Sequence, residues 1–119
     1  MIDQLEANSV FIFGSNLAGR HMGGAALTAK QKFGAIDEIG EGLVGQSYAF
    51  PTLDYELQQR DTAELEYSAM ILKYTAESLP AVTFYLTKVG CGIAGYPEEK
   101  MKALFVDMPS NVIKPEDWR

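Results

Sequence analysis

The chain has 119 residues, of which 47% are hydrophobic, and its formal net charge is −6. A chain of this size buries a substantial core without covalent staples, so we expect one domain over residues 1–119. Broad binding of DNA or RNA needs many Lys and Arg side chains to neutralise backbone phosphates, and the acidic balance argues against it. We therefore expect no nucleic-acid partner, although backbone amides can still bind a small anion.

Cys91 is the only cysteine of the chain. A lone cysteine excludes an internal disulfide and a cysteine-rich zinc site, and it suits a reducing compartment. The first residues lack a basic-then-apolar leader, and no apolar run approaches the ~18 to 20 residues that span a bilayer. We therefore expect a cytoplasmic protein with no metal, no cofactor and no membrane partner.

The first expected element is a strand at 10–13, where the short apolar run VFIF stops at Gly14. Such a run suits a strand that is buried on both faces of a parallel sheet. A glycine-rich loop follows at 14–24, and the helix formers at 25–33 predict a helix that Gly34 ends. The order is strand, glycine loop, helix.

A second glycine-punctuated stretch at 40–45 leads into a predicted strand at 46–50, which Pro51 closes. The segment DTAE at 61–64 is typical of a capping box. Apolar residues then recur at helical spacing up to Pro80, which predicts a helix.

The β-branched and aromatic residues at 82–87 predict another strand, which leads to a second glycine loop at 89–96. Proline and two acids then open a predicted helix at 97–107, and 111–113 is a last short strand. Strands that alternate with helices predict an α/β fold of three α/β/α layers with a mostly parallel central sheet.

Ligands of such sheets bind at the carboxyl ends of the strands, where both glycine loops are expected. Bare backbone amides and two helix N-termini beside one crevice favour a phosphate or diphosphate. Neither loop has the GxxxxGK[ST] or GxGxxG spacing, which argues against kinase, NTPase and Rossmann functions. The sequence predicts a nucleotide-phosphate pocket between the loops, and the alternative is that the glycines only form tight turns.

Polar residues of the loops have two interpretations each. Asn16 can bind a ribose hydroxyl or simply form a turn. His21 can serve as an acid or base near neutral pH, or be a solvated loop residue. Arg20 and Lys88 can neutralise phosphate charge or be ordinary surface groups. Cys91 lacks an evident activating base, so a half-buried loop residue is the favoured interpretation over a nucleophile.

Aromatic side chains offer a further contact. Tyr48, Phe50 and Tyr96 can stack on a base or ribose, but aromatic residues on strands usually belong to the core.

Two segments resemble the macrodomain family, whose members bind ADP-ribose and related nucleotides, particularly the branch of terminal ADP-ribose protein glycohydrolase. The run HMGGAALTAKQKFG at 21–34 resembles the first ligand loop and helix of that branch. The run LTKVGCGIAGY at 86–96 resembles its second loop, which wraps the diphosphate. The run GSN at 14–16 stands where the family has an asparagine near the distal ribose. The short chain is also similar to compact macrodomain-like proteins encoded by phages.

The resemblance implies a ligand site made of both loops and the end of the middle strand. Its residues are Gly14, Ser15, Asn16, Arg20, Gly23, Gly24, Ala25, Thr52, Gly90, Cys91, Gly92, Ile93, Ala94, Gly95 and Tyr96.

One departure concerns catalysis. In the hydrolase branch, a lysine after the middle strand and an aspartate after the Gly-Cys-Gly segment form and resolve a covalent sugar intermediate. Here the stretch FPTLD at 50–54 has no lysine, and Ala94 stands at the aspartate position. The resemblance therefore implies binding and does not carry over the lysine–aspartate mechanism.

Three hypotheses follow. The leading one is a module that binds an ADP-ribose-type nucleotide such as ADP-ribose or an NAD derivative; if a phage encodes it, it would sequester a nucleotide signal in the host cytoplasm. The second is a hydrolase that acts on ADP-ribosylated protein or a related nucleotide, with His21 or Asp54 as acid or base. The third is a structural or protein-interaction domain whose glycines only make turns.

Overall fold

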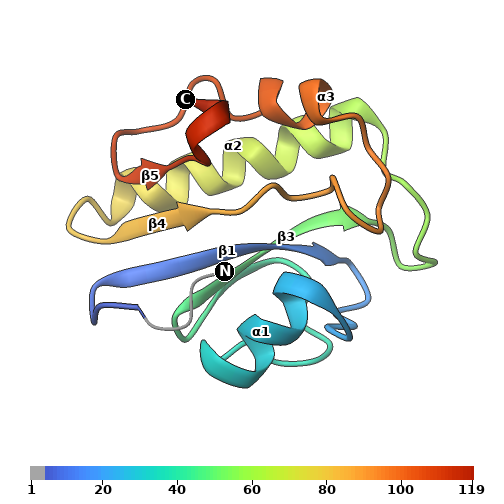
Figure 1. Ribbon diagram of the computed structural model, residues 1–119, viewed down its shortest axis with the longest axis horizontal. Helices are drawn as coiled ribbons and strands as arrows, with labels where there is room; N and C mark the ends of the chain where they lie inside the picture. The colour runs from blue at the N-terminus through green and yellow to red at the C-terminus, as the bar shows by residue number, and fades with distance from the viewer. Residues whose placement is uncertain (1–4) are drawn as a thin grey trace.

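The chain folds around a five-stranded mixed sheet with the strand order β2-β3-β1-β4-β5 (Figure 1). At its centre, β1 (Ser9–Asn16) pairs in parallel with β3 (Ser47–Leu53) on one side and β4 (Thr83–Leu86) on the other. β5 (Val112–Ile113) extends the sheet in parallel beside β4, and β2 (Gly42–Val44) adds an antiparallel edge beside β3. The expected α/β class with a mostly parallel sheet is confirmed.

The computed structural model describes residues 5–119. Its helices cover both faces of the sheet: α1 (Gly24–Lys32) lies on one face, and α2 (Thr62–Ser78) and α3 (Glu98–Ala103) lie on the other (Figure 1). A short 3-10 turn at Glu116–Trp118 follows β5. Within the described residues, no helix is both long and apolar enough to cross a membrane.

Successive side chains of β1 point to opposite faces of the sheet and so contribute to two separate parts of the core. Phe11 and Phe13 face α1, where they pack with Ala29 and Phe33. Ile12 belongs to the larger cluster on the other face, which includes buried residues of α2 and α3. Successive side chains of a strand point to opposite faces, and full burial of each such side chain stabilises the fold by about 1.5–3 kcal/mol. A strand of this kind needs helices on both of its faces.

The two central strands are longer than predicted. β1 continues beyond Gly14 because its last residues pair with β3, up to the pair Asn16–Leu53. β3 continues through Pro51, which was expected to end it. The antiparallel pairing of β2 reaches only Ala49, so the missing N–H of Pro51 falls where that neighbour has already ended.

Other elements differ at their ends. The glycine-rich stretch at 40–45 was not predicted to be a strand, yet it forms β2 and turns into β3 at Gly45, whose φ is +58°. α3 ends at Ala103, earlier than the predicted 107. The capping box is confirmed: the Asp61 side chain accepts from the Glu64 amide, and the Glu64 side chain accepts from the Asp61 amide.

Gly40 permits a close approach between two loops. A Cβ at this position would lie 2.8 Å from the Cα of Leu17 and closer still to the Asn16 carbonyl oxygen, both of which are backbone atoms. Backbone atoms cannot move aside as the end of a side chain can, so a residue with a Cβ at this position must displace the first loop.

We therefore expect Gly40→Ala to lower the free energy of unfolding by about 1–3 kcal/mol through overpacking. Gly92→Ala is the matched control, because a Cβ there meets nothing within 4 Å. Chemical denaturation of both variants measures the difference. Equal stability of the two variants would contradict the close packing at Gly40.

Candidate functional site

The loops after β1 and β4 diverge at the carboxyl edge of the sheet. These strands are neighbours, but the first loop leads to α1 on one face and the second leads to α3 on the other (Figure 1). A Cβ at Gly14 would lie 3.4 Å from the amide nitrogen of Gly90, so the bases of the two loops are in close contact. Ligands of α/β sheets bind where neighbouring strands send their connections to opposite faces, and this pair of loops is such a point.

Asn16 closes the first loop. Its Oδ1 accepts from the Arg20 amide at 3.0 Å, and its Nδ2 donates to the Arg20 carbonyl at 3.1 Å. The Gly19 amide also donates to the Asn16 carbonyl. Both polar atoms of the side chain thus have partners inside the loop, which is the turn-forming role of the two that the sequence left open.

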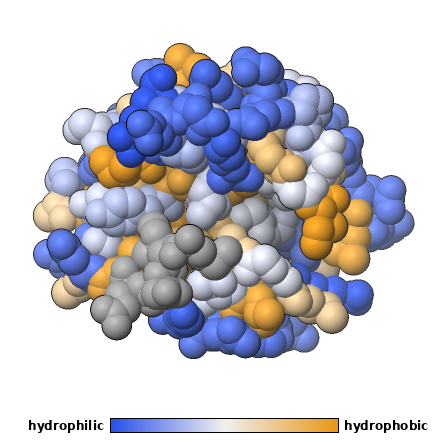
Figure 2. All heavy atoms as spheres, in the orientation of Figure 1, coloured by the Kyte–Doolittle hydropathy of each residue, from blue (hydrophilic) through white to orange (hydrophobic). Residues whose placement is uncertain are grey.

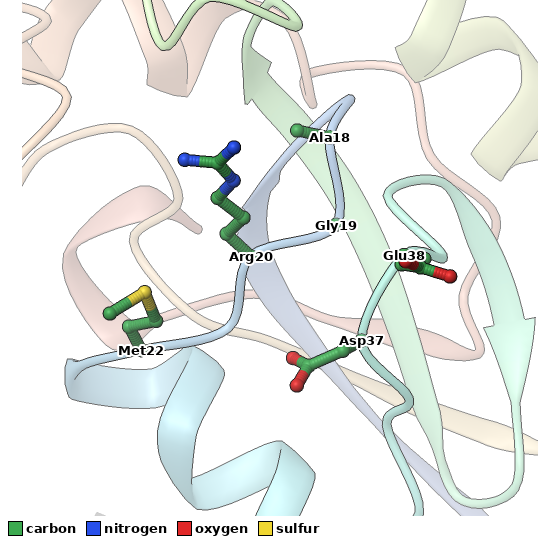
Figure 3. A pocket seen from close by; sticks show the side chains of 6 residues that line it. All are labelled: Ala18, Gly19, Arg20, Met22, Asp37 and Glu38. Carbon is green, nitrogen blue, oxygen red and sulfur yellow. The ribbon is translucent and has the colours of Figure 1, made fainter.

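A cavity of about 340 Å³ lies on the outer side of this loop, lined by residues 18–20, Met22, Asp37 and Glu38 (Figure 3). Asp37 is paired with Lys30 at 2.5 Å, and this hydrogen bond lowers the pKa of the Asp37 carboxyl. The Arg20 side chain points away from both acids in Figure 3. The cavity therefore has an exposed guanidinium on one side and an acidic wall on the other.

The sequence did not predict that Asp37 and Glu38 would line a cavity beside the first loop. It follows α1 along the chain and reaches the first loop through a hydrogen bond from the Glu38 amide to the Gly19 carbonyl. No periodicity or motif in that stretch indicates the contact.

The N-terminus of α1 is open. The N-cap residue, Gly23, makes no side-chain cap, and the first turn holds no acidic residue, whereas Lys30 and Lys32 stand in the last turn. A Cβ at Gly23 or Gly24 would meet nothing within 4 Å. The first amides of a helix lack intrahelical acceptors and carry a partial positive charge, so this end favours an anion.

The second loop exposes its backbone between two fixed ends. Gly90 and Gly95 have φ values of +79° and +77°, which only glycine adopts freely. Between them, Gly92 is exposed and Ile93 is 96% exposed. The loop is closed by hydrogen bonds from the Gly95 amide to the Gly92 carbonyl and from the Tyr96 amide to the Gly90 carbonyl.

Tyr96 anchors this loop to β3. Its buried hydroxyl accepts from the Arg60 amide at 2.7 Å and lies 2.7 Å from the Thr52 carbonyl, to which it donates. The guanidinium of Arg60, itself 7% exposed, donates from Nη1 to the Pro51 carbonyl and to Ser68. The sequence did not predict this role of Arg60, because no motif marks a buried arginine that supports a loop through hydrogen bonds.

A second anchor joins the loop to the turn after β3. Gln59 Nε2 donates to the Ala94 carbonyl at 2.8 Å. Asp54 shapes that turn, since its Oδ1 accepts from the amides of Glu56 and Gln58, each at 2.9 Å. The Oδ1 atom of Asp54 is therefore engaged in backbone hydrogen bonds that hold the turn.

His21 is buried rather than solvated. Its exposed fraction is 0%, its ring meets Phe13 edge-on at 5.0 Å, and its Nε2 lies 3.0 Å from the Ile39 carbonyl. A proton acceptor must reach its substrate, and a fully buried ring has no such access. The structure gives His21 a packing role.

Other predicted ligand residues are also buried. Thr52 donates its hydroxyl to the Ser15 carbonyl, and Ser15 donates to the Asn16 carbonyl. Tyr48, Phe50 and Tyr96 all belong to the core cluster. Ala25, on the first turn of α1, remains half-buried at the edge.

Cys91 and Lys88 both have raised pKa values. Burial raises the pKa of the Cys91 thiol, helped by the nearby Glu98, which favours the unreactive protonated form. Lys88 is paired with Asp117 at 2.6 Å and with Glu98 at 2.9 Å, and these contacts raise its pKa to about 12. The candidate site thus reduces to backbone amides, Arg20 and the exposed edges of both loops.

Apolar side chains border this edge. Met22, Tyr55 and Ile93 are 80%, 71% and 96% exposed. Figure 2 shows hydrophobic groups on the right-hand side, where Figure 1 places the carboxyl ends of the strands. Such groups provide apolar surface for a ring to lie on.

No cluster of His, Cys, Asp or Glu in residues 5–119 could hold a metal ion. In comparisons with known proteins, no family model, curated protein or solved structure matches this chain.

We expect Tyr96→Phe to release the second loop. Loss of the hydroxyl leaves the Arg60 amide and the Thr52 carbonyl buried without their partner, at a cost of about 1–3 kcal/mol. Hydrogen exchange should show faster exchange of the Gly95 and Tyr96 amides. Tyr85→Phe, on half-buried β4, is the control; the same exchange rates in both variants would contradict the anchoring role.

Proposed function

We propose that the chain is a macrodomain-like module that binds an ADP-ribose-type nucleotide between its two glycine loops. The observation that carries the proposal is the divergence of the loops after β1 and β4, with Gly14 against Gly90 at their base. Two further arguments favour a site between these loops. Residues 21–34 and 86–96 resemble macrodomain ligand loops, and ligands of α/β sheets bind where neighbouring strands send their connections to opposite faces.

The diphosphate would lie against backbone amides. The open N-terminus of α1 supplies unpaired amides on one side, and the exposed backbone around Gly92 supplies close access on the other. Arg20 has no ion pair with any described residue and is exposed beside the first loop, so it can neutralise phosphate charge without breaking an existing contact. An acidic chain can bind an anion in this way because the positive potential is local.

The remaining parts of the nucleotide would lie outside the diphosphate. The cavity of about 340 Å³ beside Arg20 is near the lower end of the range of ~300–1,000 Å³ for ligand pockets, so it would hold a sugar rather than a dinucleotide. Met22 and Ile93 offer exposed apolar surface at the two loops for a base or ribose.

Binding is better supported than hydrolysis. His21 is fully buried, the Asp54 Oδ1 is engaged by two amides, and Ala94 offers no carboxylate on the second loop. A general acid or base needs hydrogen-bond reach to the reacting group, which the fully buried ring of His21 lacks. The proposed function is therefore retention of the nucleotide.

A thermal-shift panel of ADP-ribose, NAD, AMP and cyclic derivatives tests the proposal. A ligand at 100 times its dissociation constant stabilises the native state by about 2.7 kcal/mol. Gly92→Trp should abolish the shift, because its side chain would fill the open space above the loop without backbone strain. Ala81→Trp, exposed before the start of β4, is the control and should keep the shift; a full shift with Gly92→Trp would move the site elsewhere.

Gly23→Asp separates folding from binding. Gly23 has the extended backbone of an N-cap, φ −163° and ψ 165°, so aspartate can cap α1 there and the fold should be retained. Its carboxylate would repel a phosphate at the same amides, and we expect the dissociation constant of ADP-ribose to rise about tenfold or more. Gly23→Asn gives the same cap without the charge. Calorimetric titrations that find equal affinity for Asp and Asn would contradict phosphate binding at α1.

A further inference from the structure

A groove of about 640 Å³ lies between α2 and α3, on the helical layer opposite α1. Its apolar lining includes Ala69 and Met70 from α2 and Leu104 and Met108 from the chain at and after α3. Its lining runs along α2 from the first residue, Thr62, to Tyr74, and includes Lys100 and Ala103 of α3. None of its lining residues belongs to either glycine loop, so it is distinct from the proposed nucleotide site.

An apolar stripe runs along α2 beside this groove. Tyr67, Met70 and Tyr74 are 59%, 41% and 61% exposed. Their spacing of three and four residues places them on one face of the helix. Single exposed apolar residues are ordinary, but a stripe over successive turns that adjoins an apolar groove marks an interaction surface.

The charges around the groove balance. Glu66 and Asp107 are acidic, and Lys73 and Lys100 are basic, so these lining residues sum to zero while the whole chain carries −6. Lys73 is paired with Asp107 at 2.8 Å. Such a surface does not select a strongly charged partner, and two copies of this acidic chain repel each other least where their contact faces are neutral.

We propose that this face joins two copies of the chain in a symmetric dimer, with the two α2 helices antiparallel across a two-fold axis midway between Tyr67 and Tyr74. Each Tyr67 then lies opposite the partner's Tyr74, and Met70 lies within about 1 Å of the axis level, given the rise of about 1.5 Å per residue. A two-fold contact uses the same patch on both copies, and this stripe is its own complement.

The charged residues fit the same arrangement. At 3.6 residues per turn, Tyr67 and Tyr74 lie on one side of Met70, and Glu66 and Lys73 lie on the other. Across the two-fold axis, the Glu66–Lys73 side of one helix faces the same side of the other helix. Measured along the helix axis, Lys73 then lies within about 3 Å of the level of the partner's Glu66. The dimer thus has two symmetric Lys–Glu contacts on one side of the Met70 pair and two tyrosine contacts on the other.

Sedimentation velocity over a wide concentration range tests the dimer. The unaltered chain should form dimers, and Met70→Glu should raise the dissociation constant about 100-fold, because it places two carboxylates beside the axis. Met70 is 41% exposed on a helix, so glutamate is compatible with the monomer fold, which circular dichroism checks. Ile36→Glu, on a 54% exposed residue that follows α1, is the matched control and should dimerise normally.

A charge swap tests the geometry. Glu66→Lys and Lys73→Glu should each weaken the dimer, and the double variant should regain affinity because opposite charges again face each other. A chain that stays monomeric at every concentration would overturn the proposal and leave the groove to another partner. A dimer that Met70→Glu does not weaken would overturn it as well.

Discussion

β1 is hydrogen-bonded on both of its edges, to β3 and to β4, and its side chains are buried on both faces of the sheet. A strand in this position cannot shift by one residue without exchanging the Phe11 and Ile12 faces, so its register is strongly specified. Its carboxyl end is consequently a fixed point. The two glycine loops leave the sheet beside that point, and the helices that follow them are held on opposite faces by separate core clusters.

Polar residues near this end divide into two groups with different surroundings. Asn16, Thr52, Tyr96 and Arg60 are buried residues whose hydrogen bonds hold loop ends together. At Gly23 and Gly92, in contrast, an added Cβ would meet nothing within 4 Å, so the backbone there is open on that side. Buried polar groups need partners to avoid a desolvation penalty, whereas exposed amides are free to bind a ligand. The side chains therefore support the loops, and in the proposed complex the backbone would contact the nucleotide.

Local sequence patterns predicted most of the helices and strands that form, but not where they end or which side chains are buried near the candidate site. The capping box at Asp61 and the apolar run of β1 act within a few residues, so both were predictable. The extension of β3 through Pro51 was not, because it depends on where the neighbouring β2 stops. For the same reason, the sequence did not predict the burial of His21 or of Arg60. His21 contacts Ile39 and Arg60 contacts Tyr96, and each partner is distant in sequence. Glycine spacing identified the loops but could not tell which of their polar groups point inward.

α3 links the proposed crevice to the proposed dimer face. Its first turn follows the second loop directly, and Glu98 at that turn is held by Lys88 from the base of the loop and by Trp118 from the C-terminal turn. The other side of α3 lines the groove beside α2. A partner copy packed against that groove would restrict α3 and thereby the loop attached to it. Ordering the loop before the nucleotide arrives reduces the entropy lost on binding, so a dimer would favour the ligand without contributing a residue to its site.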